Sequence, residues 1–172
     1  TTTGVGGKET LNVVGTGRYV RMFGITRGTG YGYSLWDFEV YGSAAVAGNA
    51  ALNKPAVASS TEGAGMAASF AVDGNTNTRW ASLATDAQWI YVDLGSVRAI
   101  TGVTLKWEAA YGKAYNIQVS NDATTWTTIK SVTDGNGDYD DLPVSGSGRY
   151  VRMQGVTRAT GYGYSLWDFE VY

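Results

Sequence analysis

A repeated segment constrains this chain more than any other feature of its sequence. Residues 18–41 and 149–172 align without a gap at an offset of 131 positions. They differ only at Phe23/Gln154, Ile25/Val156 and Gly28/Ala159. Identity at all but these three of the 24 aligned positions indicates an internal duplication, which is typical of a protein built from similar structural units.

The segments that precede the two copies are of unequal length, and this predicts the domain organisation. Many strand-like residues precede the second copy, back to Asn49, whereas only seventeen residues precede Arg18. We therefore predict that residues 1–41 are the C-terminal part of a first unit and that residues 49–172 form a complete second unit. Residues 42–48 are small and glycine-containing, which is typical of a linker.

Composition excludes several classes of function. The chain has no cysteine and no histidine, so disulfides, thiol catalysis and cysteine-based zinc sites are excluded, and the usual general base is absent. A net charge of −2 without a basic run argues against nucleic acid as a partner. No apolar stretch approaches the ~20 residues of a membrane helix. Abundant glycine and aromatic residues with few charges favour a secreted, extracellular bacterial β-protein.

The local sequence pattern predicts strands. Alternation of β-branched or aromatic residues with polar residues, broken by Gly, Asn and Asp, recurs at 88–95, 100–107, 114–120, 125–132, 149–156 and 165–172. Short strands at this spacing favour a β-sandwich or jelly roll. The expected inward residues are Trp89, Tyr91, Val92, Leu94, Val103, Leu105, Ile117 and Val119. Trp80, Trp107, Trp126 and Trp167 are also expected to be core residues.

One turn concentrates oxygen-bearing side chains. "AVDGNTNTRW" contains Asp73, Asn75, Asn77 and Thr78 around a glycine. Calcium takes six to eight oxygen ligands and is often held by such turns. The segment is not an EF-hand, because Thr78 stands where that loop requires glycine. An Asx-type turn without an ion explains the same residues equally well.

Polar and aromatic residues in the loops suggest a ligand site. Sugars are bound by aromatic ring faces together with polar side chains that fix the hydroxyl groups, and loops carry function more often than cores do. Packed turns and a structural salt bridge are the alternative roles for these residues. The candidates are Glu62, Arg79, Glu108, Tyr111, Arg158, Tyr162 and Tyr164.

Six motifs in fixed order carry a family resemblance across residues 49–172: "ALNKPAVASS", "AVDGNTNTRWAS", "QWIYVDLG", "YNIQVSND", "GRYVRM" and "LWDFEVY". They resemble the discoidin-type (coagulation factor 5/8 type C-like) domain, and more narrowly the family 32 carbohydrate-binding modules of bacterial β-1,3-glucanases and chitosanases. The resemblance implies an all-β fold, an eight-stranded antiparallel β-sandwich of the jelly-roll, galactose-binding-like type, with ligands bound by loops at one end.

The resemblance also implies roles for particular residues. A structural calcium ion would be held by the side chains of Asp73, Thr78 and Glu170 and by carbonyls near Phe70 and Asn75. Arg79 would lie between Glu62 and Glu108 and hold both carboxylates ionised. These two residues are not expected to be a catalytic pair, because a glycosidase also needs a cleft for several sugar rings.

We therefore predict a non-catalytic module that targets a secreted glycoside hydrolase to a β-linked polysaccharide, either β-1,3-glucan or chitosan. The alternative is a discoidin-type domain that mediates protein or lipid adhesion. Membrane binding is not expected, because the loops carry Gly, Ala, Thr and Tyr rather than large apolar residues. The apolar face of residues 1–41 needs to be covered, either by the rest of their own unit or by strand exchange with a neighbouring molecule. The alternative is that this face packs on the outside of the complete unit.

Overall fold

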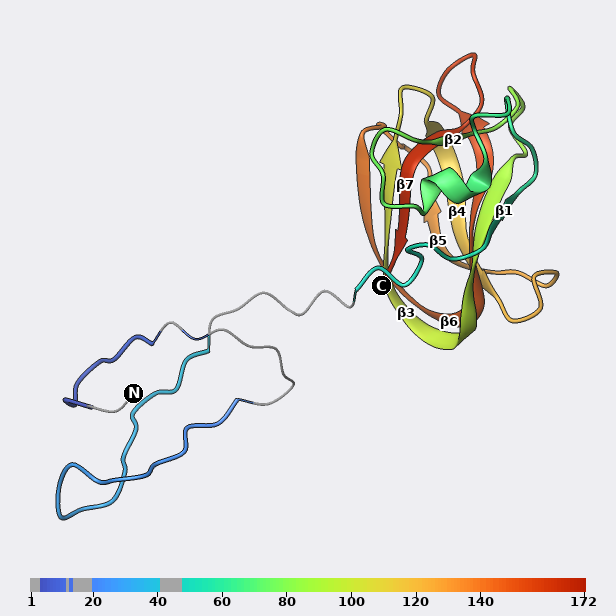
Figure 1. The fold of residues 1–172 in the computed structure, drawn as a ribbon. Coiled ribbons are helices and arrows are strands. Elements are labelled where there is room, and N and C mark those ends of the chain that lie inside the picture. Colours follow the sequence, from blue (N-terminus) through green and yellow to red (C-terminus); the bar gives the residue numbers. More distant parts are fainter. Residues whose placement is uncertain (1–3, 12, 14–19, 41–47) are drawn as a thin grey trace. The chain divides into compact units, whose positions relative to one another are not determined.

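The computed structural model describes residues 4–11, 13, 20–40 and 48–172. The chain divides into two compact units, Thr1–Val46 and Ala47–Tyr172, which are considered separately. The described residues of the first unit contain no helix or strand (Figure 1). The second unit contains all the regular secondary structure of the described chain, and no described helix is long and apolar enough to cross a membrane.

The second unit is an antiparallel β structure, as predicted. Its described strands pair in the order β2-β7-β3-β6-β4-β5, and β1 joins the edge of β3. The elements are β1 (Ala56–Ala58), the 3-10 helix η1 (Ala68–Ala71), β2 (Trp80–Ala81), β3 (Trp89–Trp107), β4 (Gly112–Ser120), β5 (Thr127–Val132), β6 (Tyr139–Arg158) and β7 (Ser165–Val171).

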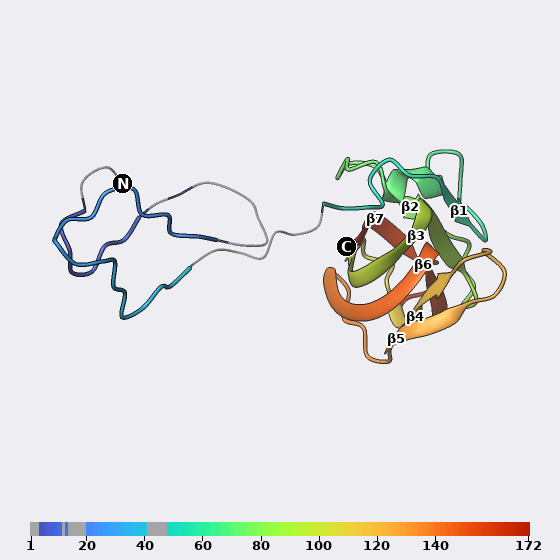
Figure 2. The same ribbon diagram turned by 90° about the horizontal axis from the view of Figure 1, so that it is seen from below.

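The described residues form seven strands where eight were expected, because β3 and β6 are long and bent. Their pairing runs from Trp89↔Gln154 to Lys106↔Tyr139 and is interrupted between Asp93 and Arg98. On one side of this break β3 pairs with β1 and β6 with β4, whereas on the other side β3 pairs with β7. The two long strands therefore contribute to both layers and wrap around the core, as the end-on view shows (Figure 2).

The core of the second unit follows a two-residue period, but part of the prediction had the wrong phase. Ile90, Val92 and Leu94 point inward and are buried. Trp89 and Tyr91 are half-buried and lie on the opposite face of β3, so their assignment to the core was wrong. Both faces of this strand carry large apolar side chains, and the sequence alone therefore did not fix which face points inward.

Trp80 and Trp107 are buried as expected, whereas Trp126 and Trp167 are half-exposed.

The large apolar residues described in the first unit are exposed. Trp36 is 105% exposed, and Phe38 is 52% exposed, whereas its counterpart Phe169 is 0% exposed. In the second copy the corresponding segment forms the end of β6 and all of β7. β6 pairs with β4, and β7 pairs with β3. The described residues of the first unit have no such partner strands, which explains why the expected C-terminal strands are not formed there. The expected strand exchange stays a prediction.

The bend between β3 and β6 is held by an ion pair. Arg149 donates to Asp93 through Nε and Nη2, at 2.8 and 2.7 Å, and the Gly95 N–H donates to the same carboxylate. The Arg149 hydrogen bond, supported by that of Gly95, lowers the pKa of Asp93 below its usual value. A carboxyl whose pKa is lowered on folding adds stability above its unfolded pKa and loses it as the pH falls.

Replacing this carboxylate tests its contribution. We expect Asp93→Asn to lower the free energy of unfolding by about 1 kcal/mol at pH 7, since the pair is bidentate but partly exposed. The difference from the parent protein should shrink as the pH falls through ~4. Urea unfolding at pH 7 and pH 3 measures both values, with Asp134→Asn as the control because its ion pair with Lys113 is largely exposed. An equal loss at both pH values would contradict the electrostatic explanation.

Candidate functional site

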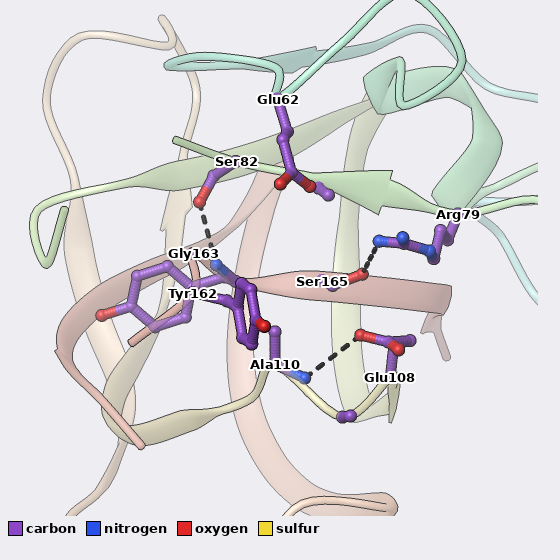
Figure 3. A pocket seen from close by; sticks show the side chains of 11 residues that line it. Glu62, Arg79, Ser82, Glu108, Ala110, Tyr162, Gly163 and Ser165 are labelled. Carbon is purple, nitrogen blue, oxygen red and sulfur yellow. Dashed lines mark hydrogen bonds between the residues drawn. The ribbon is translucent and has the colours of Figure 1, made fainter. Parts of the chain in front are cut away.

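A cavity of about 330 Å³ opens between loops at one end of the second unit (Figure 3). Four segments that are far apart in sequence build it: the loop after β1, β2 with its flanking residues, the β3–β4 turn and the β6–β7 turn. The lining residues are Glu62, Arg79, Ala81, Ser82, Glu108, Ala109, Ala110, Tyr162, Gly163, Tyr164 and Ser165. Five of the seven predicted ligand-binding residues are among them.

Two carboxylates, with the Arg79 guanidinium, give the cavity a net negative charge. Glu62 is exposed, and Glu108 is half-buried and accepts a 3.2 Å hydrogen bond from the Ala110 N–H. Figure 3 shows them entering the cavity from different segments of the chain. Among the described residues neither carboxylate forms an ion pair. Both are therefore available to accept hydrogen bonds from a ligand.

Arg79 does not hold these two carboxylates together, contrary to the expectation. Its Nη1 donates to Ser165 Oγ at 2.8 Å, and its guanidinium carbon lies 5.8 Å from the centre of the Trp167 ring. The pairing of β2 with β7 sets Ala81 opposite Ser165, and this brings the neighbouring Arg79 over β7. The guanidinium therefore forms one wall of the cavity and is fixed by β7.

The two tyrosines of the β6–β7 turn have different roles. Tyr164 is 0% exposed, its hydroxyl donates to the Asp86 carbonyl at 2.8 Å, and its N–H donates to Ser82 Oγ at 2.9 Å. Burial raises the pKa of Tyr164 to about 12. Tyr162 is 70% exposed and presents its ring at the mouth of the cavity. Tyr164 thus fixes the turn, and Tyr162 is accessible to a ligand.

Arg158 lies outside the cavity lining and holds the turn that contains Tyr162. Its Nε donates to Asp86 at 2.8 Å, and its Nη1 donates to the carbonyls of Gly161 and Tyr162 at 3.2 and 3.0 Å. The bond from Arg158 lowers the pKa of Asp86. The predicted ligand residue Arg158 is therefore placed as a positioning residue.

The remaining ligand candidate, Tyr111, also lies outside the cavity. It packs against the hydrophobic core, its ring lies close to Gly137, and its carbonyl accepts the Ala159 N–H at 3.0 Å. Conversely, the sequence analysis missed Ser82 and Ser165, which line the cavity and bind Tyr164 and Arg79. They are small residues next to large aromatic ones, and only the β2–β7 pairing reveals their position.

The oxygen-rich turn is compact. Thr78 Oγ1 lies 2.8 Å from Asp73 Oδ2 and 2.9 Å from the Asn75 carbonyl oxygen, and the Asn75 N–H donates to Asp73 Oδ1. Phe70 belongs to η1 just before this turn, and Glu170 lies on β7, where it accepts a bond from the Tyr172 hydroxyl. Among the described residues no cluster of three or more His, Cys, Asp or Glu side chains is arranged for a metal.

Asp168 brings further negative charge near this turn. Its Oδ1 is the one buried side-chain oxygen or nitrogen without a hydrogen-bond partner in the described chain. Burial, and then the charges of Glu170 and Asp73, raise the pKa of Asp168 to about 6. The turn and β7 therefore place acidic groups close together without a basic side chain bonded to them.

A comparison with family models assigns the second unit. The F5/8 type C domain model matches residues 55–169. The chain belongs to this family. The fold is similar to that of solved modules: chitosan-binding module 1 of the chitosanase/glucanase from Paenibacillus sp. IK-5 is 55% identical, with a TM-score of 0.70, over 72% of this chain and 98% of that module. Module 2 of the same enzyme, solved with chitotriose, is 52% identical over 72% and 99%, also with a TM-score of 0.70.

A more distant relative of this chain is a polysaccharide lyase 8 family protein, HylA, from Enterococcus faecalis. It is 32% identical over 111 residues, or 59% of this chain. The chain spans only 8% of the length of that lyase. The match therefore concerns a small part of a much larger protein, which is named as a polysaccharide lyase.

The packing of Tyr164 against Gly155 predicts how rigid the cavity is. A Cβ at Gly155 would lie 2.3 Å from the Tyr164 ring, whereas nothing lies within 4 Å of a Cβ at Gly161. We expect Gly155→Ala to lower the free energy of unfolding by about 1–3 kcal/mol, because the buried ring must move. Thermal unfolding measures this, with Gly161→Ala in the β6–β7 turn as the control. Equal melting temperatures for the two variants would contradict a fixed ring.

Proposed function

We propose that this F5/8 type C domain is a non-catalytic module that binds chitosan or a related β-linked polysaccharide and holds a parent glycoside hydrolase on it. The observation that carries the proposal is the pair of unneutralised carboxylates, Glu62 and Glu108, in a cavity with an exposed aromatic ring. Relatives over 50% identical, which match almost over their full length, are named as chitosan-binding modules.

The chemistry of the cavity favours an amino sugar. A glucosamine ammonium group donates charge-assisted hydrogen bonds, which are stronger than those of a neutral hydroxyl, to carboxylates such as Glu62 and Glu108. The exposed ring of Tyr162 offers an apolar face to the sugar, as aromatic side chains do in many ligand sites. Neutral β-1,3-glucan can use the same acceptors through its hydroxyl groups, but it gains no charge-assisted bond. Chitosan is therefore the preferred ligand.

We infer that the module acts by attachment and not by catalysis. The cavity lies among loops at one end of a small sandwich and offers no long cleft for several sugar rings. The solved relatives are binding modules derived from a chitosanase/glucanase, and they match this chain over almost their full length. Release of reducing sugar from soluble chitosan or glucan by the purified chain would contradict this assignment. We also propose that the module and its parent hydrolase are secreted, since the polysaccharide is extracellular.

We also propose that residues 1–41, in the first unit, belong to another module of the same kind. The turn around Arg27 repeats the bonds of the turn around Arg158: Arg27 Nη1 donates to the carbonyls of Gly30 and Tyr31 at 3.1 and 3.4 Å. The N–H of Tyr31 donates to Thr29 Oγ1, as that of Tyr162 donates to Thr160 Oγ1. A second module would raise the effective ligand affinity through avidity.

We propose calcium as a structural ion of the turn at residues 73–78. Three oxygens of Asp73, Asn75 and Thr78 already converge, and Asp168 and Glu170 supply negative charge from β7. A carbonyl from the region of Phe70 would complete a set of hard oxygen ligands, which calcium prefers. The ion would tie the turn before β2 to the last strand.

Removing one carboxylate tests the ligand site. We expect Glu62→Gln and Glu108→Gln each to weaken chitosan-oligosaccharide binding roughly tenfold, because each variant loses a charge-assisted bond. Binding to the parent protein should also weaken as salt screens the charges and as the pH rises past the amine pKa of the sugar. Isothermal titration calorimetry measures the affinity, with Asp134→Asn as a control that removes the same charge outside the cavity. Unchanged affinity in both glutamine variants would overturn the site.

Chelation tests the calcium proposal. An ion bound only by the folded state stabilises it by mass action, so saturating calcium should raise the melting temperature by about 3–8 °C over the chelated protein. Asp73→Ala should abolish this difference, whereas Asp134→Ala, an exposed acidic control, should preserve it. A melting temperature that does not respond to calcium or chelator would contradict the ion.

A further inference from the structure

The outward face of the sheet formed by β3, β6, β4 and β5 carries an ordered set of polar and aromatic side chains. Residues paired across strands share one face of a sheet. The register aligns Tyr91 with Arg152 and Arg152 with Gln118, and in the next row it aligns Trp89 with Gln154 and Gln154 with Asn116. All six residues are half-buried, although their neighbours along each strand are buried. The face is thus regular, partly accessible and distinct from the cavity at the loop end.

Aromatic rings cluster on this face. Trp89 and Tyr91 stack with ring centres 5.5 Å apart and an angle of 13° between the planes. Tyr91 also contacts Trp126 at 5.6 Å and Tyr150 at 5.7 Å. Four rings that are half-exposed on one sheet face exceed what a solvated face needs, because such side chains gain stability mainly by burial. This part of the surface therefore resembles a contact surface.

Arg152 is the charged centre of the cluster. Its guanidinium carbon lies 4.1 Å from the centre of the Trp126 ring, and Nε and Nη2 both donate to Gln118 Oε1, at 2.9 and 2.6 Å. These bonds use two of the five N–H groups of a guanidinium. In the described part of the chain no carboxylate bonds to Arg152. Burial lowers the pKa of Arg152, because it disfavours the charged form.

Arg149, three residues before Arg152 on β6, differs from it in its partner. Its charge is neutralised by the bidentate bond to Asp93. Among the described residues Arg152 hydrogen-bonds only to a neutral amide oxygen and stacks on the Trp126 ring. A half-buried cation without an anionic partner is stabilised when a ligand supplies one. The spare donors form a planar fork, which matches the two oxygens of a carboxylate.

We propose that Tyr91, Trp126, Arg152 and Gln118 form a second binding surface for a carboxylate-bearing sugar, such as a uronic acid unit of a polysaccharide. The guanidinium of Arg152 binds the carboxylate, and Asn116 Nδ2 donates to a hydroxyl group. Gln118 fixes the guanidinium through Oε1 and is itself held by its Nε2 bond to Thr128 Oγ1 at 3.0 Å. The exposed parts of the rings pack against the sugar. This surface is opposite in charge to the cavity with Glu62 and Glu108, so the two sites take different ligands. The inference does not depend on the function proposed for that cavity.

The experiment titrates the full chain with trigalacturonate and, separately, with chitotriose, and follows both by calorimetry. Trigalacturonate should bind the parent protein, and Arg152→Gln should weaken this binding by tenfold or more, since the variant loses the cation that binds the carboxylate. Trp126→Ala should also weaken it. Arg149→Gln should change the affinity less than twofold, although it removes the same charge from a nearby position. Glu62→Gln should not weaken trigalacturonate binding.

A second variant distinguishes a role of Arg152 in binding the carboxylate from a purely structural role. Arg152→Lys keeps the charge and loses the fork, so it should weaken trigalacturonate binding several-fold. The far-UV circular dichroism of all Arg152 variants should match that of the parent protein, which shows that they are folded. The proposal is overturned if the parent protein does not bind trigalacturonate. It is also overturned if Arg149→Gln weakens binding as much as Arg152→Gln, because binding would then reflect general charge, or if Glu62→Gln abolishes it, because the ligand would then occupy the loop cavity.

Discussion

The pairing of β3 with β6 is the constraint on which the rest of the second unit depends. Both strands continue through the bend and take part in both layers, so one hydrogen-bonded pair positions β1, β4 and β7. A Cβ at Gly148 would lie 3.0 Å from the Ser120 carbonyl oxygen, which shows how close β6 runs to the end of β4 at the bend. The same two strands end at the loop cavity, since Glu108 follows β3 and the turn with Tyr162 follows β6.

The loops of the cavity are connected to each other as well as to the strands. Ser82 accepts the N–H of Tyr164, Asp86 joins Arg158, and a Cβ at Gly163 would lie 2.3 Å from the Ser82 carbonyl oxygen. These contacts fix the loop before β3 against the β6–β7 turn. Binding to a preformed cavity loses less conformational entropy than binding that must order loops. A shallow site with few charged groups can therefore bind a sugar usefully, particularly when it is repeated along a chain.

The sequence predicted those features that are local or strictly periodic. The repeat, the all-β class and the loops with Glu62, Glu108 and Tyr162 follow from short patterns, and so does the turn in which Asp73 lies close to Thr78. The phase of β3 was not predictable, because Trp89 and Tyr91 alternate with Ile90 and Val92 and both sets are apolar. The partner of Arg79 depends on the β2–β7 register, which no local pattern gives. Tyr111 and Arg158 are residue types that often bind sugars. In the structure Tyr111 packs against the core, and Arg158 bonds to Asp86.

The central claim is that the loop cavity recognises an amino sugar through Glu62 and Glu108. The most direct measurement is an NMR titration of the full chain with chitotriose, in which backbone amide shifts are mapped onto the structure. The account predicts that the largest shifts occur at residues lining the cavity, including Glu62, Ser82, Ala110 and Ser165. Largest shifts on the outward face around Tyr91 and Gln118, or no shifts at saturating chitotriose, would contradict it.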